Sequence, residues 1–433
     1  MKIFERYFER NKIGWFPAFP NKPEIIVIIP VLNDRDIFAT INSLRRCTCR
    51  NGNAGVIVVV NHSEAASEST KQANRLLTEE LRQGICREQN ECSAVYVEVV
   101  EAFDLPVKQA GVGLARKIAM DAAAYYFYQQ GKTEHPVLSL DADTLVDVNY
   151  FDATRHYFQE YPVAGVSIAY AHRLEECGEE VANAMVKYEL YLRYYQQALE
   201  YTGHPYAFHC IGSAFAVRAS DYVAQGGMNK RQAGEDFYFL QKLISTGRFA
   251  TLQTTRVYPS ARFSARTPFG TGQAVRQIVS DKGEFEVYNF GAFRDLKCFF
   301  SGLSALYKAG RERSEDYFFR QPRGVCSFWT EMDGPDFLAE VNANCASLPQ
   351  FVKRFFVHFN AFRVLKYLNF VHENEYQKVP VQSAAEALFR ELKYPRAAGN
   401  TLIFCGRRTG FEWASDCFFP GYKCRKRKLC IFA

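Results

Sequence analysis

Glu24-Ile25-Ile26-Val27-Ile28-Ile29-Pro30 is the stretch that decides the fold, because its apolar residues follow one another without a polar interruption. Such a continuous run is typical of a strand that is buried on both faces, and we expect Pro30 to end it. A second run of this kind, Gly55-Val56-Ile57-Val58-Val59-Val60, ends at Asn61. Residues 37–46 between the two runs have apolar side chains at helical spacing. The sequence therefore predicts a right-handed β-α-β unit with parallel strands.

The same alternation of strand and helix continues to about residue 260. Further strands are expected at residues 94–100, 136–140, 164–169, 214–217 and 251–257, and helices at residues 67–83, 113–130, 219–225 and 236–247. This order predicts an α/β fold with a mostly parallel, open sheet flanked by helices. In such sheets ligands bind beyond the carboxyl ends of the strands.

The sequence pattern changes after about residue 275. From there on, the residues have helical spacing, many are aromatic or basic, and no clear strand pattern occurs. We therefore expect an N-terminal extension at residues 1–23, a catalytic domain at residues 24–275 and a mainly helical C-terminal region at residues 276–433.

Composition indicates an ordinary globular protein, since 48% of the 433 residues are hydrophobic and 23% are charged. The net charge of +6 favours anionic partners without specifying them, and we expect no nucleic-acid partner. The first 20 residues lack the apolar segment of a secretory signal, and no stretch approaches the roughly 18 apolar residues of a spanning helix. We therefore expect a cytoplasmic protein, soluble or peripheral at the inner face of the cell membrane.

The 13 cysteines are odd in number and form no C-x-x-C pair, so most are expected to be reduced thiols. Cys47-Thr48-Cys49 and the tail cysteines Cys417, Cys424 and Cys430 leave a zinc site open, although neither spacing is typical of one. The basic cluster at residues 425–428 can contact anionic lipid headgroups, and a solvated terminus is the alternative.

Two acidic motifs carry the chemistry. Asp141-Ala142-Asp143 follows a predicted strand, where one or two carboxylates can hold a hard divalent cation and leave room for substrate phosphates. Glu235-Asp236 opens a later helix and can supply a base that is not used by the metal. Together the motifs indicate an enzyme that activates a phosphate-linked donor. The alternatives are an Asx turn at the first motif and acids that complement a helix dipole at the second.

Five motifs occur in a familiar order at plausible spacing. They are Pro30-Val31-Leu32-Asn33-Asp34, Gly113-Leu114-Ala115-Arg116-Lys117, Asp141-Ala142-Asp143, Ile211-Gly212-Ser213-Ala214-Phe215-Ala216-Val217-Arg218 and Gly234-Glu235-Asp236. Over about residues 24–275 the chain thus resembles glycosyltransferase family 2, the inverting sugar-nucleotide transferases of GT-A fold. It departs from the family pattern at Lys117, where Asn is usual, and at Asn61, where Asp is usual, which leaves the nucleotide open.

The resemblance and the chemistry together assign roles to the motif residues. Asp143 is the expected ligand of Mn²⁺ or Mg²⁺, and the resemblance implies that Asp141 contacts the donor ribose or the metal and its bound water. Asp236 is the expected general base, with Glu235 orienting the acceptor or its loop. The expected donor-binding residues are Pro30, Asn33, Asp34, Asn61, Arg116, Lys117, Asp141, Arg262 and Arg266.

Two of these assignments have plain structural alternatives. Arg116 and Lys117 can pair with the donor diphosphate, or they can form a solvated first turn of a helix. Arg262 and Arg266, followed by Gly270-Thr271-Gly272, can form a lid over the donor phosphates, or an ordinary surface turn.

The expected function is the transfer of a sugar from a nucleotide-diphosphate donor to a hydroxyl of a glycan or lipid-linked acceptor. A UDP-sugar is favoured, GDP- and dTDP-sugars stay open, and the expected setting is bacterial cell-surface or exopolysaccharide synthesis. A nucleotidyltransferase would need a Gly-rich phosphate loop after the first strand, where this chain has Pro30-Val31-Leu32-Asn33-Asp34. A non-catalytic glycan-binding protein would have lost the base or the metal ligand, and both are present.

Three histidines, His172, His204 and His209, stand in the sequence near the expected acceptor side. A histidine ligand to the metal is one interpretation, and a structural role with satisfied ring nitrogens is the favoured one.

Overall fold

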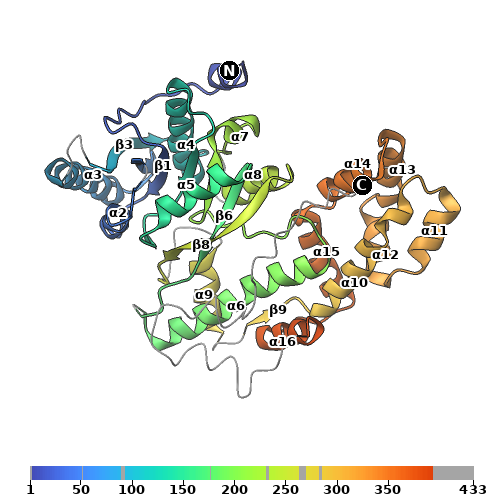
Figure 1. Ribbon diagram of the computed structural model, residues 1–433. Helices are drawn as coiled ribbons and strands as arrows, with labels where there is room; N and C mark the ends of the chain where they lie inside the picture. Colours follow the sequence, from blue (N-terminus) through green and yellow to red (C-terminus); the bar gives the residue numbers. More distant parts are fainter. Residues whose placement is uncertain are drawn as a thin grey trace. The chain divides into compact units, whose positions relative to one another are not determined.

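The computed structural model describes residues 2–50, 52–88, 93–175, 177–230, 234–262, 270–281 and 285–393 (Figure 1). The chain forms two compact units. The first comprises Met1–Met185 and Phe208–Gln277, and the second comprises Val186–Ala207 and the residues from Ile278 onward. The second unit thus includes residues 186–207, which the sequence pattern placed in the catalytic domain at residues 24–275.

An eight-stranded sheet in the order β3-β2-β1-β4-β7-β6-β8-β5 forms the centre of the first unit. β1 to β4 run parallel, as do β6 and β8, whereas β7 and β5 run antiparallel to their neighbours. The strands are β1 Ile25–Val31, β2 Ala54–Ser63, β3 Val95–Leu105, β4 Pro136–Ser139, β5 Thr144–Val146, β6 Gly165–Tyr170, β7 Phe215–Arg218 and β8 Phe249–Pro259. The predicted α/β class with a mostly parallel sheet is confirmed, and the arrangement is consistent with a GT-A-like fold.

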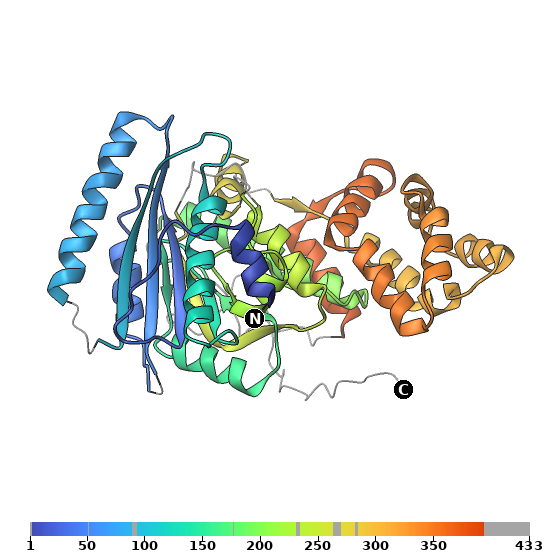
Figure 2. The ribbon, with the colours of Figure 1, turned by 90° about the horizontal axis from the view of Figure 1, so that it is seen from above.

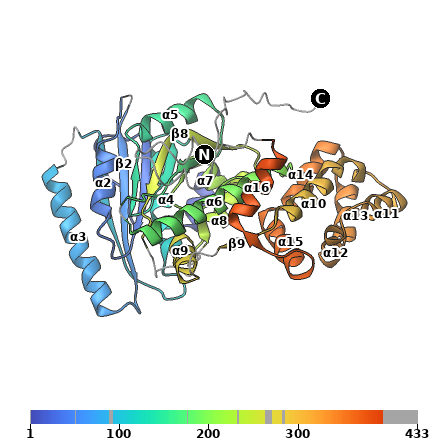
Figure 3. The same ribbon diagram turned by 90° about the horizontal axis from the view of Figure 1, so that it is seen from below.

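Helices cover both faces of this sheet. α2 and α3 lie on one face and α4 on the other, as the two turned views show (Figures 2 and 3). The helices of the first unit are α1 Lys2–Arg10, α2 Ile37–Arg45, α3 Glu68–Glu88, α4 Val112–Gln129, α5 Tyr150–Glu160, α7 Ala219–Ala224 and α8 Glu235–Ile244. Two helices cross the boundary between the units: α6 Glu179–Tyr201 enters the second unit at Val186 and α9 Thr271–Ser280 enters it at Ile278. Because β1 runs parallel to both β2 and β4, the carboxyl ends of these three strands lie at the same edge of the sheet, where ligands bind in such folds.

Pro30 does not end β1, contrary to our prediction. All seven residues of the strand are buried, and Pro30 pairs with Val59 before the strand continues to Val31. Pairing of β1 with β4 covers only Ile26 to Ile28, so Pro30 has a paired strand on one side only. A residue without an N–H group can stand there without removing a hydrogen bond from the centre of the sheet.

The second unit is helical, as predicted for the C-terminal region. Its helices are α10 Phe290–Ser301, the 3₁₀ helix η1 Leu303–Leu306, α11 Arg311–Phe319, α12 Arg323–Glu331, α13 Gly334–Asn344, α14 Leu348–His358, α15 Ala361–Asn374 and α16 Val381–Glu391. This mainly helical unit also contains one short pair of strands that the sequence pattern did not indicate, in which β9 Glu286–Val287 pairs with β10 Val379–Pro380. Buried Phe299 packs edge-on against Trp329 and Phe355, so much of the aromatic content forms this core.

The described part of the chain contains no helix that combines the length and the apolar character needed to cross a membrane. Every cysteine within it is a free thiol. The tail cysteines and the basic cluster at residues 425–428 lie outside the described residues.

Candidate active site

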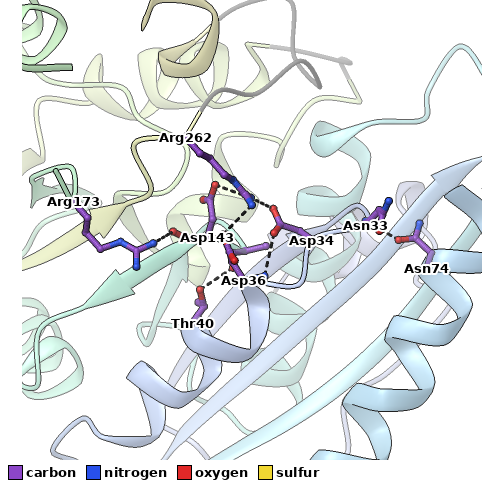
Figure 4. Close-up of polar contacts among 9 residues, drawn as sticks. Asn33, Asp34, Asp36, Thr40, Asn74, Asp143, Arg173 and Arg262 are labelled. Atoms are coloured by element: carbon purple, nitrogen blue, oxygen red, sulfur yellow. Dashed lines mark hydrogen bonds and ion pairs between the residues drawn. The ribbon is translucent and has the colours of Figure 1, made fainter. Parts of the chain in front are cut away.

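The D-x-D motif lies in the turn between β4 and β5, and other elements hold its backbone in place. The Thr40 hydroxyl on α2 donates to the carbonyl of Ala142 at 2.8 Å. The carbonyl of Asp143 accepts from the Ser260 N–H group at 3.1 Å and from Arg173 at 3.2 Å. With the backbone held in this way, the side chain of Asp143 projects toward neighbouring acids in Figure 4.

Arg116 on α4 connects the two acidic motifs. Its Nη1 binds the Glu235 carboxylate, its Nη2 binds the Asp141 carboxylate, and its Nε donates to the Ser139 hydroxyl at 3.1 Å. We call these contacts the Arg116 bridge. Arg116 is only 3% exposed, and each of its three guanidinium nitrogens has a protein partner.

The electrostatics of the bridge favour a charged arginine. Burial lowers the pKa of Arg116, but Asp141 and Glu235 outweigh that effect and hold the pKa above its ordinary value. Burial raises the pKa of Glu235, and Arg116 opposes the rise. An ion pair in this position is hydrogen-bonded and compensated, as a buried charge must be.

Gly212 makes the bridge sterically feasible. A Cβ atom at this position would lie 2.6 Å from Nη2 and 2.8 Å from Cζ of Arg116. The sequence contained a signal for this residue, because Gly212 belongs to one of the five motifs, but only the fold shows that its partner is Arg116.

A second cluster gathers around Arg262, just beyond β8 (Figure 4). Its Nη2 contacts the Asp34 carboxylate and lies 3.0 Å from Asp143 Oδ2, while its Nη1 lies 2.9 Å from Asp36 Oδ2. Burial and then the neighbouring Asp141 raise the pKa of Asp143 to about 6, although Arg262 opposes the rise. Asp36 is a member of the cluster that sequence reasoning missed, since it stands two residues beyond the recognised turn.

Asn74 on α3 joins the carboxyl ends of β1 and β2. Its Oδ1 accepts from the backbone N–H of Asn33 at 2.7 Å, and its Nδ2 donates to the carbonyl of Asn61 at 2.9 Å. Asn33 has a φ of +44°, a conformation that needs such support. Asn61 donates its own amide to the carbonyl of Val31 at 2.8 Å, so its side chain links the strands. No motif marks Asn74, because a single Asn inside a helix carries no pattern.

Asp236 is the second residue of α8 and directly follows the bridged Glu235. Its Oδ1 accepts from the Phe237 N–H group at 2.7 Å. Burial raises the pKa of Asp236, and Arg116 opposes that effect in part. The left-handed Gly234, with a φ of +71°, turns the chain into the helix at this point.

Lys117 lies away from the acidic site, with partners on α4 and α1. Lys117 Nζ lies 2.9 Å from Asp121 and donates to the Tyr7 hydroxyl at 3.0 Å, in a buried group that connects α4 with α1. Arg266 and the rest of residues 263–269 of the proposed lid lie outside the described residues. His204 belongs to the core of the second unit, where its Nε2 faces the carbonyl of Phe359 at 2.8 Å.

The acids fit a divalent cation that the substrate helps to hold. Among the residues the structure describes, no group of three His, Cys, Asp or Glu side chains is placed to bind a metal alone. However, the carboxylates of Asp34 and Asp143 converge on one nitrogen of Arg262. Mg²⁺ typically takes one or two carboxylates, several waters and substrate phosphates, which matches this incomplete set.

No protein-family model matches the chain, and no curated protein matches it in sequence. Its fold is similar to that of Staphylococcus aureus TarS 1–349 in complex with UDP-GlcNAc, at 13% identity and a TM-score of 0.39, over 78% of this chain and 93% of that one. It is also similar to the mannosyltransferase PcManGT from Pyrobaculum calidifontis in complex with GDP-Man and Mn²⁺, at 15% identity and a TM-score of 0.36, over 90% and 87% of the two chains. At these scores the likenesses carry no argument about activity.

Proposed function

We propose that the chain is an inverting glycosyltransferase of the family 2 type, which moves a sugar from a nucleotide-diphosphate donor to a hydroxyl acceptor. The observation that carries the proposal is the Arg116 bridge. One buried guanidinium binds Asp141 of the D-x-D motif and Glu235 of the G-E-D motif, so it joins the motif that contains the proposed metal ligand Asp143 to the motif that contains the proposed base Asp236.

The donor end of the site is the cluster around Arg262. Asp143, with Asp34 beside it, would hold Mn²⁺ or Mg²⁺, and such an ion would neutralise the charge that grows on the departing diphosphate. Arg116 holds the Asp141 carboxylate through Oδ1, and we propose that the exposed part of this side chain contacts the ribose of the donor. Pro30, Asn33 and Asn61 form the strand ends that Asn74 connects, which is where the nucleoside would lie. The proposal favours a UDP-sugar and leaves GDP- and dTDP-sugars open.

The acceptor end is the start of α8. A hydroxyl is a weak nucleophile unless its proton is removed as the new bond forms, and Asp236 is the proposed general base. The raised pKa of Asp236 supports this role, because a base is most effective when its pKa lies near the working pH. Glu235 is occupied by Arg116, so we assign it the positioning of α8. Inversion follows if Asp236 lies across the anomeric carbon from the diphosphate.

The acceptor in this proposal is a glycan or a lipid-linked sugar of bacterial surface or exopolysaccharide synthesis. The site of action is then the cytoplasmic side of the membrane, with the basic tail at residues 425–428 in contact with anionic lipid.

The test is a screen of UDP-, GDP- and dTDP-sugars for donor turnover, with Mn²⁺ and with EDTA. We expect one donor class to be turned over with Mn²⁺ and not with EDTA, and Asp143→Ala to remove that turnover. Asp236→Asn should retain donor binding and lower transfer by roughly 10²–10⁴-fold.

Asp152→Asn is the matched control for Asp236→Asn. Asp152 is a partly buried aspartate that pairs with Arg155 on α5, so this variant should transfer sugar at the normal rate. Near-normal transfer by Asp236→Asn to a true acceptor would refute the assignment of the base.

A further inference from the structure

Arg262 stands at the point where a cation shared by two of the site carboxylates would stand. A single atom, Nη2, contacts both the Asp34 carboxylate and Asp143 Oδ2. A Mg²⁺ ion bound to the same two carboxylates would need oxygens at about 2.0–2.1 Å, within the space that this nitrogen fills. The guanidinium and the divalent ion therefore exclude each other at this pair of acids.

The three acids of the cluster are Asp34, Asp36 and Asp143, and a nearby positive charge offsets the repulsion between their carboxylates. The Asp34 side chain is 5% exposed and that of Asp143 is 25% exposed, so water screens their mutual repulsion only in part. Arg262 supplies this charge and also pairs with Asp36 at 2.9 Å. An arginine does so at every accessible pH, because its guanidinium stays protonated.

We infer that Arg262 is an exchangeable counter-ion of the site, which keeps the divalent cation out until the donor diphosphate arrives. When the cation binds Asp34 and Asp143, the guanidinium is released and can form a bidentate contact with a phosphate. The Arg262 side chain is 36% exposed and lies on the chain just beyond β8, which leaves it free to change partner more easily than the buried Arg116.

This inference rests on the proposed function and adds a property to it. Cation and donor must then bind cooperatively, and the coupling is reciprocal by thermodynamic necessity. The protein without donor then binds a divalent ion only weakly.

The test measures Mn²⁺ binding to the full chain by the loss of the free Mn²⁺ signal in electron paramagnetic resonance, without donor and with UDP. The wild type should bind Mn²⁺ weakly alone and at least about tenfold more tightly with saturating UDP, within the range of ordinary coupling. Arg262→Ala should bind Mn²⁺ alone at least about tenfold more tightly than the wild type, and UDP should improve that affinity less. Arg262→Gln, which keeps the length of the side chain without its charge, should behave in the same way.

Arg35→Ala is the matched control. Arg35 lies between Asp34 and Asp36 in sequence, but its guanidinium is exposed and pairs with Glu80 on α3. The control removes one positive charge from the same turn and should bind Mn²⁺ like the wild type.

Equal Mn²⁺ affinity in the wild type and in both Arg262 variants overturns the inference, and so does an equal gain in Arg35→Ala. Failure of the proposed function looks different. The Arg262 variants would then gain Mn²⁺ affinity as expected, while no sugar nucleotide is turned over by any variant or by the wild type.

Discussion

Gly212 is the residue whose substitution tests the Arg116 bridge most directly. In Gly212→Ala the new Cβ would lie 2.6 Å from Arg116 Nη2, so the guanidinium must shift away from Asp141 and Glu235. We expect a loss of about 1–3 kcal/mol in the free energy of unfolding, measured by urea denaturation, together with a fall in sugar transfer.

The control for this substitution is Gly84→Ala on α3. An added Cβ at Gly84 meets nothing within 4 Å, so alanine should stabilise the helix by roughly 0.5–1 kcal/mol. If Gly212→Ala is as stable and as active as Gly84→Ala, then the close approach to Arg116 has no energetic consequence.

At the scale of residues, the sequence singled out Asp34, Asp141, Asp143 and Glu235, which the structure shows paired with arginines, but it missed Asp36 and did not show how the acids are paired. Asp141 and Asp143 follow a buried strand, and such strand ends meet at one edge in a parallel sheet. The directions of Arg116 and Lys117 were not predictable, because successive residues of a helix point about 100° apart. Only the packing of α4 shows that Arg116 faces the acids while Lys117 faces α1. Asn74 acts entirely through tertiary contacts and leaves no trace in the sequence pattern.

At the scale of elements, helix α1 is fixed to the first unit by a buried polar group. Asp121 accepts from the hydroxyls of Tyr7 at 2.7 Å and Tyr222 at 2.6 Å, and it pairs with Lys117 at 2.9 Å. Burial, with Asp121 as the next cause, raises the pKa of Tyr7, so its proton stays on the phenol oxygen. Gly227 leaves the space that the Tyr7 hydroxyl occupies, since a Cβ there would lie 1.9 Å from that oxygen.

Asp121→Ala should destabilise the protein more than any loss of a single hydrogen bond. The substitution leaves the Lys117 ammonium buried without its partner carboxylate, an effect of about 3–5 kcal/mol, measured by urea denaturation. Tyr7→Phe removes one hydrogen bond from the same group and should lower the free energy of unfolding by only about 1 kcal/mol. Similar losses in the two variants would contradict a charged Lys117.

Most strands were predictable as elements, including the short β4 and β7, whereas the strands of two or three residues, β5, β9 and β10, were not. β1 and β2 are apolar along their length, and their burial follows from that pattern. β5 has three residues directly after the D-x-D motif, and it exists because β8 lies beside it. α6 has 23 residues with aromatic, acidic and small side chains mixed around it, so no single apolar stripe marked it as a helix.

At the scale of the whole molecule, a buried histidine sets part of the pH dependence of stability. The Nε2 of His204 lies 2.8 Å from the carbonyl of Phe359, and its Nδ1 accepts from the Tyr206 N–H group at 3.2 Å. Protonation of His204 at Nδ1 would place a new N–H donor against the backbone N–H group of Tyr206. Burial lowers the pKa of His204 from 6.5 to about 4.

We therefore expect the free energy of unfolding to fall as the pH drops from 6.5 toward 4. In this window the unfolded chain takes up a proton at His204 and the folded chain does not, which lowers stability by at most about 1.4 kcal/mol per pH unit. The measurement is urea denaturation at a series of pH values. His204→Gln should reduce the slope, whereas His156→Gln, at a histidine with an exposed side chain, should leave it unchanged. An unaltered slope in His204→Gln would show that other groups cause the acid sensitivity.

The antiparallel pairing of β5 with β8 restricts which insertions and deletions the sequence can accept in these two strands. Thr144 stands opposite Pro259, and the next contact joins the Ser260 N–H group to the Asp143 carbonyl. Side chains alternate along a strand, so inserting or deleting a single residue in either strand would turn Arg262 away from Asp143. Relatives that keep every acid of the site but differ by one residue in these strands would then lack Arg262 beside Asp143, so alignment gaps at this position distinguish two electrostatic types of the same fold.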